Sequence, residues 1–357
     1  MANLQNVRTL MGDQDPANRV KNFKEVALGY STGAAMNEAD RCLNCKNRPC
    51  VSGCPVGIPI PDFLRKVADG DINGAYEILS AANALPSISG RVCPQETQCE
   101  GMCVRGIKGE SIAIGRIERF VADWAYLRGY NEKIKAVPSN GHKVAVIGSG
   151  PAGLTCAGEL ARMGYEVTVF EAFHVAGGVL SYGIPEFRLP KAVVKREVEK
   201  LEKMGVKIEL NMVIGKVLTI TELFEEQGFE AVFIGSGAGL PMFMKIPGES
   251  LIGVYSANEY LTRINLMKAY KDDSPTPCST TRRWPWWAAA TWPWTPPGAP
   301  SAWGPRSISS TAAPRLSSPP VPRRSTTRSR RGSSSICSPT LCPSRGMKRA
   351  RSSPSPA

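Results

Sequence analysis

The sequence predicts an α+β multidomain protein with a helical N-terminal domain, a Rossmann-type α/β domain and a non-native, disordered C-terminal tail. Three observations support this division. Cysteine-rich loops alternate with helical patterns over residues 1–140, a strand–glycine turn–helix pattern begins at Lys143, and the composition changes abruptly near Pro277. A chain of 357 residues fits two or three domains, because one hydrophobic core rarely grows that large.

Helical patterns separate the cysteine-bearing loops of residues 1–140. Apolar residues recur every three to four positions in Ile60–Asp69, Ile72–Ala82 and Ser111–Leu127, as on the buried face of a helix. We therefore expect a small helical domain built around loops.

The first cysteine run, Cys42-x2-Cys45-x4-Cys50-x3-Cys54-Pro55, has the spacing of an iron–sulfur site. Closely spaced thiolates can surround a compact iron–sulfur core. In two-cluster ferredoxins the cysteine before the proline ligates the other cluster, and Cys54 has that position.

A second group, formed by Cys93-Pro94, Cys99 and Cys103, brings the number of cysteines in this domain to seven. That number is one ligand short of two four-ligand clusters. Two zinc sites are the alternative, since zinc also uses grouped cysteines. Cys156 lies in a predicted helix beside small residues, and we expect it to serve packing.

The α/β domain, predicted over residues 141–277, begins with the strand Val144–Ile147. Gly148, Gly150 and Gly153 follow, with Pro151 and Ala152 opening the helix Pro151–Met163, and the strand Glu166–Phe170 ends at Glu171. Such glycines allow a tight turn and a close approach to a pyrophosphate, and the acid suits a ribose. Further elements are expected at Lys191–Met204, Lys207–Leu210, Thr221–Gln227 and Ala231–Ile234, with the α/β pattern continuing to the segment Gly253–Ala269.

Residues 278–357 carry the whole formal charge of +13, because they contain twelve Arg, one Lys and no acid. The 31 basic and 31 acidic residues before them balance. Six of the seven Trp also lie in this tail, which makes it too apolar for a typical disordered arm. A basic arm that binds nucleic acid is therefore the less favoured interpretation.

Three motifs give this sequence a specific resemblance to a family. The segments Arg41–Cys50, Gly90–Pro94 and Ile114–Glu118 resemble the small (beta) subunit of NADPH-dependent glutamate synthase. Related chains are the large subunit of NADH-dependent ferredoxin:NADP oxidoreductase and the N-terminal half of dihydropyrimidine dehydrogenase. The resemblance implies two [4Fe-4S] clusters, one on Cys42, Cys45, Cys50 and Cys103, and the other on Cys54, Cys93, Cys99 and Glu118. Without the resemblance, Glu118 would be taken for a solvated helix residue.

The same resemblance implies that the dinucleotide is FAD. Gly177, Gly178 and Val179, then the string Tyr182–Lys191, are similar to the segment along the flavin, in which Arg188 would contact the cofactor. An exposed surface charge is the alternative for Arg188. Gly235 and Gly237 resemble the turn that leads from the FAD domain to an NADPH domain.

The tail has the composition expected of a frameshifted NADPH domain. Because Trp has one codon and Pro is CCN, the bases behind Trp284–Trp294 can be regrouped one position earlier. The new frame permits an apolar strand, Gly-Gly-Gly-Asn and a helix, as in the family's second Rossmann unit. Ser307–Ala313 likewise permits a strand that ends in two arginines suited to NADP. We therefore expect residues 278–357 to be a frameshifted remnant.

The implied function is transfer of electrons from NADPH, through FAD and the clusters, to a large glutamate synthase subunit or another flavoprotein or ferredoxin. The large subunit would use them to form glutamate from glutamine and 2-oxoglutarate. No residue here is expected to perform that amide chemistry. Alternatives are a bifurcating ferredoxin:NADP oxidoreductase subunit and a non-catalytic cluster protein with a nucleic-acid-binding arm. Lacking a signal peptide or an apolar run of about 20 residues, the chain is expected in the cytoplasm, away from membranes.

Overall fold

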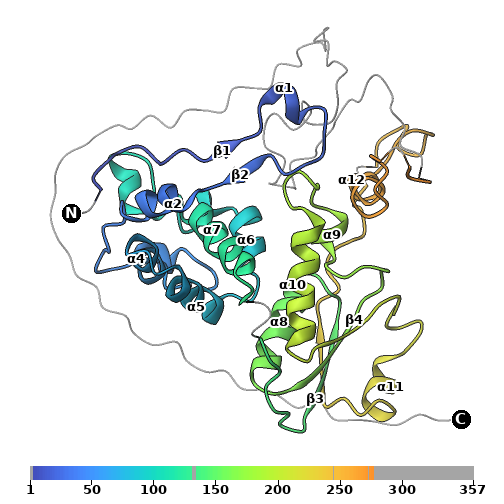
Figure 1. The fold of residues 1–357 in the computed structure, drawn as a ribbon. Coiled ribbons are helices and arrows are strands. Elements are labelled where there is room, and N and C mark those ends of the chain that lie inside the picture. Colours follow the sequence, from blue (N-terminus) through green and yellow to red (C-terminus); the bar gives the residue numbers. More distant parts are fainter. Residues whose placement is uncertain (1–2, 131–133, 244, 272, 277–357) are drawn as a thin grey trace, which may run out of the picture. The chain divides into compact units, whose positions relative to one another are not determined.

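The computed structural model describes residues 3–130, 134–243, 245–271 and 273–276 (Figure 1). All of them belong to one compact unit, Met1–Ile308. The predicted tail, residues 278–357, lies outside the described residues.

The N-terminal part is helical, as predicted. A short antiparallel pair, β1 (Gly12–Asp13) and β2 (Ala27–Gly29), precedes most of the helices. The helices are α1 (Pro16–Arg19), α2 (Thr32–Ala39), α3 (Pro49–Ser52), α4 (Ile60–Ala68), α5 (Ile72–Ala82), α6 (Pro86–Val92) and α7 (Ile114–Leu127), with 3-10 turns at Gln95–Thr97 and Val104–Ile107.

Apolar spacing explains how α4 packs. Ile60, Phe63, Leu64 and Val67 recur at helical spacing and are all at most 1% exposed. They join one core with residues of α5 and α7. Each buried side chain of this size contributes about 1.5–3 kcal/mol relative to an exposed one, so this stripe fixes α4 against its neighbours.

The second part contains a four-stranded parallel sheet in the order β5-β4-β3-β6. Its elements are β3 (Lys143–Ile147), α8 (Pro151–Arg162), β4 (Glu166–Phe170), α9 (Val179–Tyr182), α10 (Lys191–Lys203), β5 (Lys207–Glu209), α11 (Ile220–Glu225) and β6 (Ala231–Ile234), followed by α12 (Ala257–Leu261) and a π-helical turn at Thr262–Leu266. Every predicted element up to β6 is present, with ends that differ by at most three residues from the prediction.

Both faces of the sheet are covered. Val146, facing one side, packs with Leu154 of α8 and Leu201 of α10. Ala145, facing the other side, packs with Leu223 of α11 and with Phe229. Because side chains alternate along a strand, adjacent residues of β3 enter different cores.

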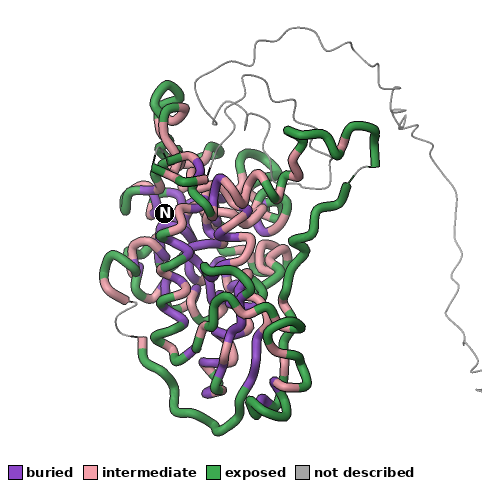
Figure 2. The backbone as a smooth tube through the Cα atoms, turned by 90° about the vertical axis from the view of Figure 1, so that its right-hand side faces the viewer, coloured by how far each residue is buried: buried purple, intermediate pink, exposed green. Residues whose placement is uncertain are grey.

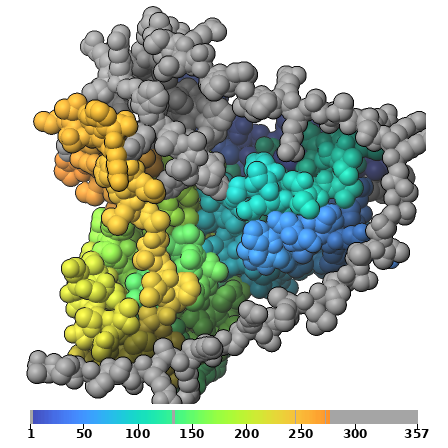
Figure 3. All heavy atoms as spheres, turned by 180° about the vertical axis from the view of Figure 1, so that it is seen from behind, coloured from blue at the N-terminus to red at the C-terminus, as the bar shows by residue number. Residues whose placement is uncertain are grey.

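The segment that directly follows β6 is largely exposed. Leu240, Met242 and Ile252 are each at least 90% exposed. This segment is drawn as exposed tube in Figure 2 and lies on the surface, in orange and yellow, in Figure 3. No helix in the described part of the chain is both long and apolar enough to cross a membrane.

Candidate cofactor sites

Four of the predicted cluster ligands line one pocket. Cys42 follows α2, Cys45 lies in the next turn, Cys50 is in α3, and Cys103 directly precedes a 3-10 turn. Left-handed backbone at Asn44 and Arg48, with φ of 45° and 42°, tightens the loop that carries the first three. Apolar side chains of α4 and α7 complete the wall: Ile60, Leu64 and Ile114.

The protein environment disfavours free thiolates in this pocket. Burial raises the pKa of Cys42, and it raises the pKa of Cys50 to about 11, with Cys42 and Cys103 adding to the effect. Thiolates must therefore be offset by a positive centre if they form here. Four converging thiols suit a group such as an iron–sulfur cluster, which supplies that charge.

The other four predicted ligands also lie near one another. Cys54 follows α3, Cys93 caps the end of α6, Cys99 is in the following loop, and Glu118 is on α7. Burial raises the pKa of Cys93 to about 11 and also raises that of Cys99. Charge on Cys54 and Glu118 adds to both shifts, which places these groups in one electrostatic neighbourhood.

Glu118 is buried, so the alternative of a solvated helix residue does not hold. It is 5% exposed, and its Oε1 atom accepts hydrogen bonds from Asn83 Nδ2 at 2.9 Å and Ser89 Oγ at 2.6 Å. Burial raises the pKa of this carboxyl to about 7, although the two donors oppose the shift. The helical pattern alone could not reveal that Glu118 is buried and hydrogen-bonded, because Asn83 and Ser89 come from a separate segment of the chain.

Within the described residues, no three His, Cys, Asp or Glu side chains are gathered closely enough to hold a single metal ion. Cys156 is half-buried and packs beside the core under the sheet, as expected of a packing residue.

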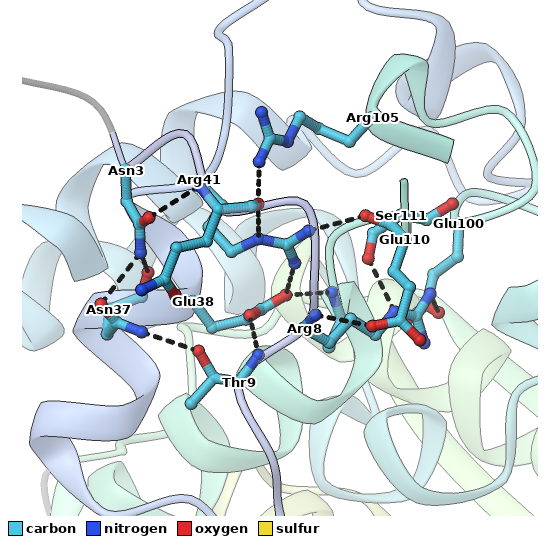
Figure 4. Close-up of polar contacts among 12 residues, drawn as sticks. Asn3, Arg8, Thr9, Asn37, Glu38, Arg41, Glu100, Arg105, Glu110 and Ser111 are labelled. Carbon is cyan, nitrogen blue, oxygen red and sulfur yellow. Dashed lines mark hydrogen bonds and ion pairs between the residues drawn. The ribbon is translucent and has the colours of Figure 1, made fainter. Parts of the chain in front are cut away.

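A polar network near the N-terminus supports both cysteine groups (Figure 4). Arg41, which precedes Cys42, pairs with Glu38 at 2.6 Å and donates from Nε to the Gln5 carbonyl at 3.0 Å. Arg8 pairs with Glu100, which follows Cys99, at 2.7 Å. Gln5 therefore contacts the residue before Cys42, which belongs to the first cysteine group. Arg8 contacts the residue after Cys99, which belongs to the second. The sequence prediction missed this network because its partners lie up to about 100 positions apart.

The glycine turn after β3 has the geometry of a dinucleotide site. Gly148 has a φ of 98°, and a Cβ there would lie 2.5 Å from the Gly235 carbonyl oxygen. A Cβ on Gly153 would lie 1.9 Å from the Gly148 carbonyl oxygen. Gly150 instead faces open space, as close approach of a phosphate requires, and Pro151 and Ala152 are exposed at the start of α8.

Glu171 lies beside this turn, but its oxygens already accept hydrogen bonds within the chain. Oε2 accepts from the Ser149 backbone N at 2.9 Å and from the Ser149 hydroxyl, and Oε1 accepts from the Phe173 N at 2.9 Å. The Ser149 hydroxyl also accepts from the Gly177 N at 2.9 Å. Ser149 thus connects the turn, the acid and the next loop. The sequence prediction did not include Ser149 among the site residues.

The loop from Gly177 to Lys191 returns to the turn. A Cβ on Gly178, whose φ is 52°, would lie 2.8 Å from the Gly150 Cα, and Val179 begins α9 directly after it. The Lys191 Nζ donates to the carbonyls of Leu180 at 2.9 Å, Leu189 at 3.1 Å and Ile184. Burial lowers the pKa of this lysine to about 8. Sequence reasoning missed its role, which is to hold the loop closed.

The remaining predicted flavin residues differ in their surroundings. Arg188 is half-buried and its pKa is lowered by burial, while Glu96, in the loop between Cys93 and Cys99, acts in the opposite direction. Gly235 packs on Gly148, but Gly237 is exposed with open space around it.

Two protein families match the chain. Residues 19–130 match the family described as dihydropyrimidine dehydrogenase domain II, 4Fe-4S cluster. Residues 142–273 match the pyridine nucleotide-disulphide oxidoreductase family. These two matches follow the division between the helical part and the parallel sheet.

Known relatives carry both regions. The glutamate synthase [NADPH] small chain of Halomonas elongata is 40% identical over 256 residues, which are 70% of this chain and 54% of that protein. The NAD-dependent dihydropyrimidine dehydrogenase subunit PreT of Escherichia coli O157:H7 is 40% identical over 61% of this chain and 53% of its own length. A solved complex of 2-naphthoyl-CoA reductase aligns with a TM-score of 0.32 and 22% identity, over 58% of this chain and 28% of that chain.

The chain spans about half the length of the curated relatives it matches. Over that half, the two matched families and the relatives at about 40% identity agree with the fold, a 4Fe-4S domain followed by an oxidoreductase domain with a parallel sheet. The chain is therefore an iron–sulfur flavoprotein of the oxidoreductase family that includes the small chain of NADPH-dependent glutamate synthase.

Proposed function

We propose that this chain derives from an oxidoreductase that takes electrons from NADPH and passes them, through FAD and two [4Fe-4S] clusters, to a partner protein. The observation that carries the proposal is the separation of eight predicted ligands into two neighbourhoods of four. The first holds Cys42, Cys45, Cys50 and Cys103 around one pocket, and the second holds Cys54, Cys93, Cys99 and Glu118.

The flavin would be held by backbone more than by side chains. Gly150 leaves room for the pyrophosphate at the start of α8, where N–H groups are available to an anion. Ribose binding by Glu171 would require the ribose hydroxyl to replace the donation from Ser149. Gly177, Gly178 and Val179 would complete the wall. Bound flavin supplies the conversion of a two-electron donor into single-electron transfers.

The proposed acceptor is a large glutamate synthase subunit, supported by the small chains among the relatives. The large subunit would then form glutamate from glutamine and 2-oxoglutarate. A ferredoxin:NADP oxidoreductase assembly is the second candidate, because its large subunit shares the cysteine motifs. We place the protein in the cytoplasm, where thiols stay reduced and available to iron.

We further propose that residues 278–357 are a frameshifted remnant of the NADPH domain. The Trp-rich, acid-free composition supports this, as do the exposed Leu240, Met242 and Ile252, apolar side chains that a continuing domain would cover. Resequencing the gene tests it, and a confirmed frame with the same tail in homologues would contradict it. The purified chain should then lack NADPH-dependent dye reduction and retain FAD poorly.

Counting iron tests the cluster proposal. After anaerobic reconstitution, the full chain should bind about eight iron and eight labile sulfide. Cys42→Ser should affect the spectroscopic signal of one cluster and Cys93→Ser that of the other. Cys156→Ser, a matched control outside both groups, should change neither. Binding of one or two zinc ions in place of iron would contradict the proposal.

A further inference from the structure

The carboxylate of Glu118 is held from one side only. Both of its hydrogen bonds, from Asn83 and Ser89, fall on Oε1, and Oε2 accepts none from the described residues. Glu118 is 5% exposed and Asn83 is 8% exposed. Placing a carboxylate in such surroundings costs free energy unless both oxygens find partners. Oε2 is therefore the oxygen left available to a partner from outside the polypeptide.

The backbone fixes which way the two donors point. Leu85 N donates to Asn83 Oδ1 at 3.0 Å, so the amide oxygen is used and the NH2 group must face Glu118. That NH2 group also donates to Ser89 Oγ at 2.7 Å. The Ser89 hydroxyl has a single proton, and its contact with Oε1, at 2.6 Å, is shorter than its contact with the Leu85 carbonyl, at 3.0 Å. Donation to the charged acceptor is favoured.

The anchored carboxylate belongs to the second cysteine group. Ser89 and Cys93 are four residues apart at the end of α6, and the Cys93 N donates to the Ser89 carbonyl at 3.0 Å. Burial raises the pKa of both Cys93 and Cys99, and charge on Glu118 adds to both shifts, as expected of a carboxylate near both thiols.

We propose that Asn83 and Ser89 are positioning residues for the second cluster. They anchor Oε1 of Glu118, so that Oε2 is presented to the one iron that Cys54, Cys93 and Cys99 leave without a thiolate. This inference rests on the proposed ligand set, and it assigns a role to two residues outside every cysteine and glycine motif.

The test uses the full chain with both clusters reconstituted anaerobically. In Asn83→Ala/Ser89→Ala, the carboxylate loses both anchors, and the second cluster should lose one iron on mild oxidation. Electron paramagnetic resonance should then show a three-iron signal from the second cluster, while the signal of the first cluster stays unchanged. Ser87→Ala is the matched control, because Ser87 is a buried serine of α6 without a hydrogen bond to Glu118.

Single variants of Ser89 separate a loss of positioning from a loss of folding. Asn83 is less suitable for this purpose, because its side chain also accepts a hydrogen bond from Leu85 N. Ser89→Ala should shift the midpoint potential of the second cluster alone, and a tenfold change in the relative stability of its two oxidation states corresponds to about 59 mV. Ser89→Thr keeps the hydroxyl and should restore the original potential. Identical signals and potentials in Ser89→Ala, Ser89→Thr and the unaltered chain would overturn the inference. An unaltered chain that binds no second cluster would instead refute the proposed function.

Discussion

The ion pair between Glu38 and Arg41 should be essential for the fold of the cluster domain. Both side chains are 0% exposed and lie 2.6 Å apart. Glu38 also accepts from the backbone N of Thr9 at 2.6 Å and of Ala113 at 2.9 Å. In Arg41→Met, these two neutral donors alone would face a buried carboxylate that has lost its counter-charge.

Removing one partner of a buried pair typically costs about 3–5 kcal/mol, out of a total stability of about 5–15 kcal/mol. At an m-value of about 2 kcal/mol/M, the urea midpoint should fall by about 2 M. Arg48→Met is the matched control, because Arg48 forms an exposed pair with Asp62, with side chains 45% and 40% exposed. An exposed pair contributes about 0–1 kcal/mol, so this midpoint should move by at most about 0.5 M.

Urea unfolding is followed by circular dichroism on the anaerobically purified chains, with the m-value checked to be equal in all variants. Glu38→Leu/Arg41→Met, which removes both charges, should recover part of the loss, because no unpaired charge remains. Equal urea midpoints for Arg41→Met and Arg48→Met would refute the reasoning that burial determines how much each ion pair contributes to stability.

Two further predictions concern the flavin domain. Gly150→Ala should leave the fold intact and weaken FAD binding at least about tenfold, because its Cβ enters the open space meant for phosphate; Gly153→Ala should instead unfold the domain, since its Cβ would lie 1.9 Å from a carbonyl oxygen. Thermal unfolding and flavin fluorescence titration distinguish the two. Because burial lowers the pKa of Lys191 to about 8 from an ordinary 10.5, the unfolded chain binds more protons between these values, and stability should rise with pH across that window. Lys191→Met should remove this rise in unfolding measurements, whereas Lys195→Met, at an exposed lysine of the same helix, should keep it.

The elements that could be predicted from the sequence are those whose own residues carry a period. β4 and β6 match their predicted bounds, since β-branched and aromatic residues lie between clear turn signals. α6 was not predicted, because Pro86–Val92 contains two Ser and a Gly and is too short to show a clear apolar period. Gly90 is required there for another reason: a Cβ would lie 2.5 Å from the backbone N of Arg119 on α7. Packing between distant segments forms this helix, and local sequence does not record such packing.

The same difference between local patterns and contacts of distant segments applies to the candidate site. The spacing of cysteines and glycines is local, so the motifs were visible in the sequence. The supporting contacts are not local: Asn83 and Ser89 reach Glu118 across 35 and 29 positions, and Ser149 reaches Glu171 across 22. Their roles became apparent only from the structure, because Ser and Asn are common in turns and caps throughout proteins.

The two cysteine groups are not independent, because each of two loops contributes to both. Cys50 and Cys54 lie four residues apart around α3, and each belongs to a different group. Cys99 and Cys103 are divided in the same way. The two loops also touch, since a Cβ on Gly53 would lie 2.7 Å from the Met102 Cγ. A displacement of either loop is therefore expected to disturb both groups.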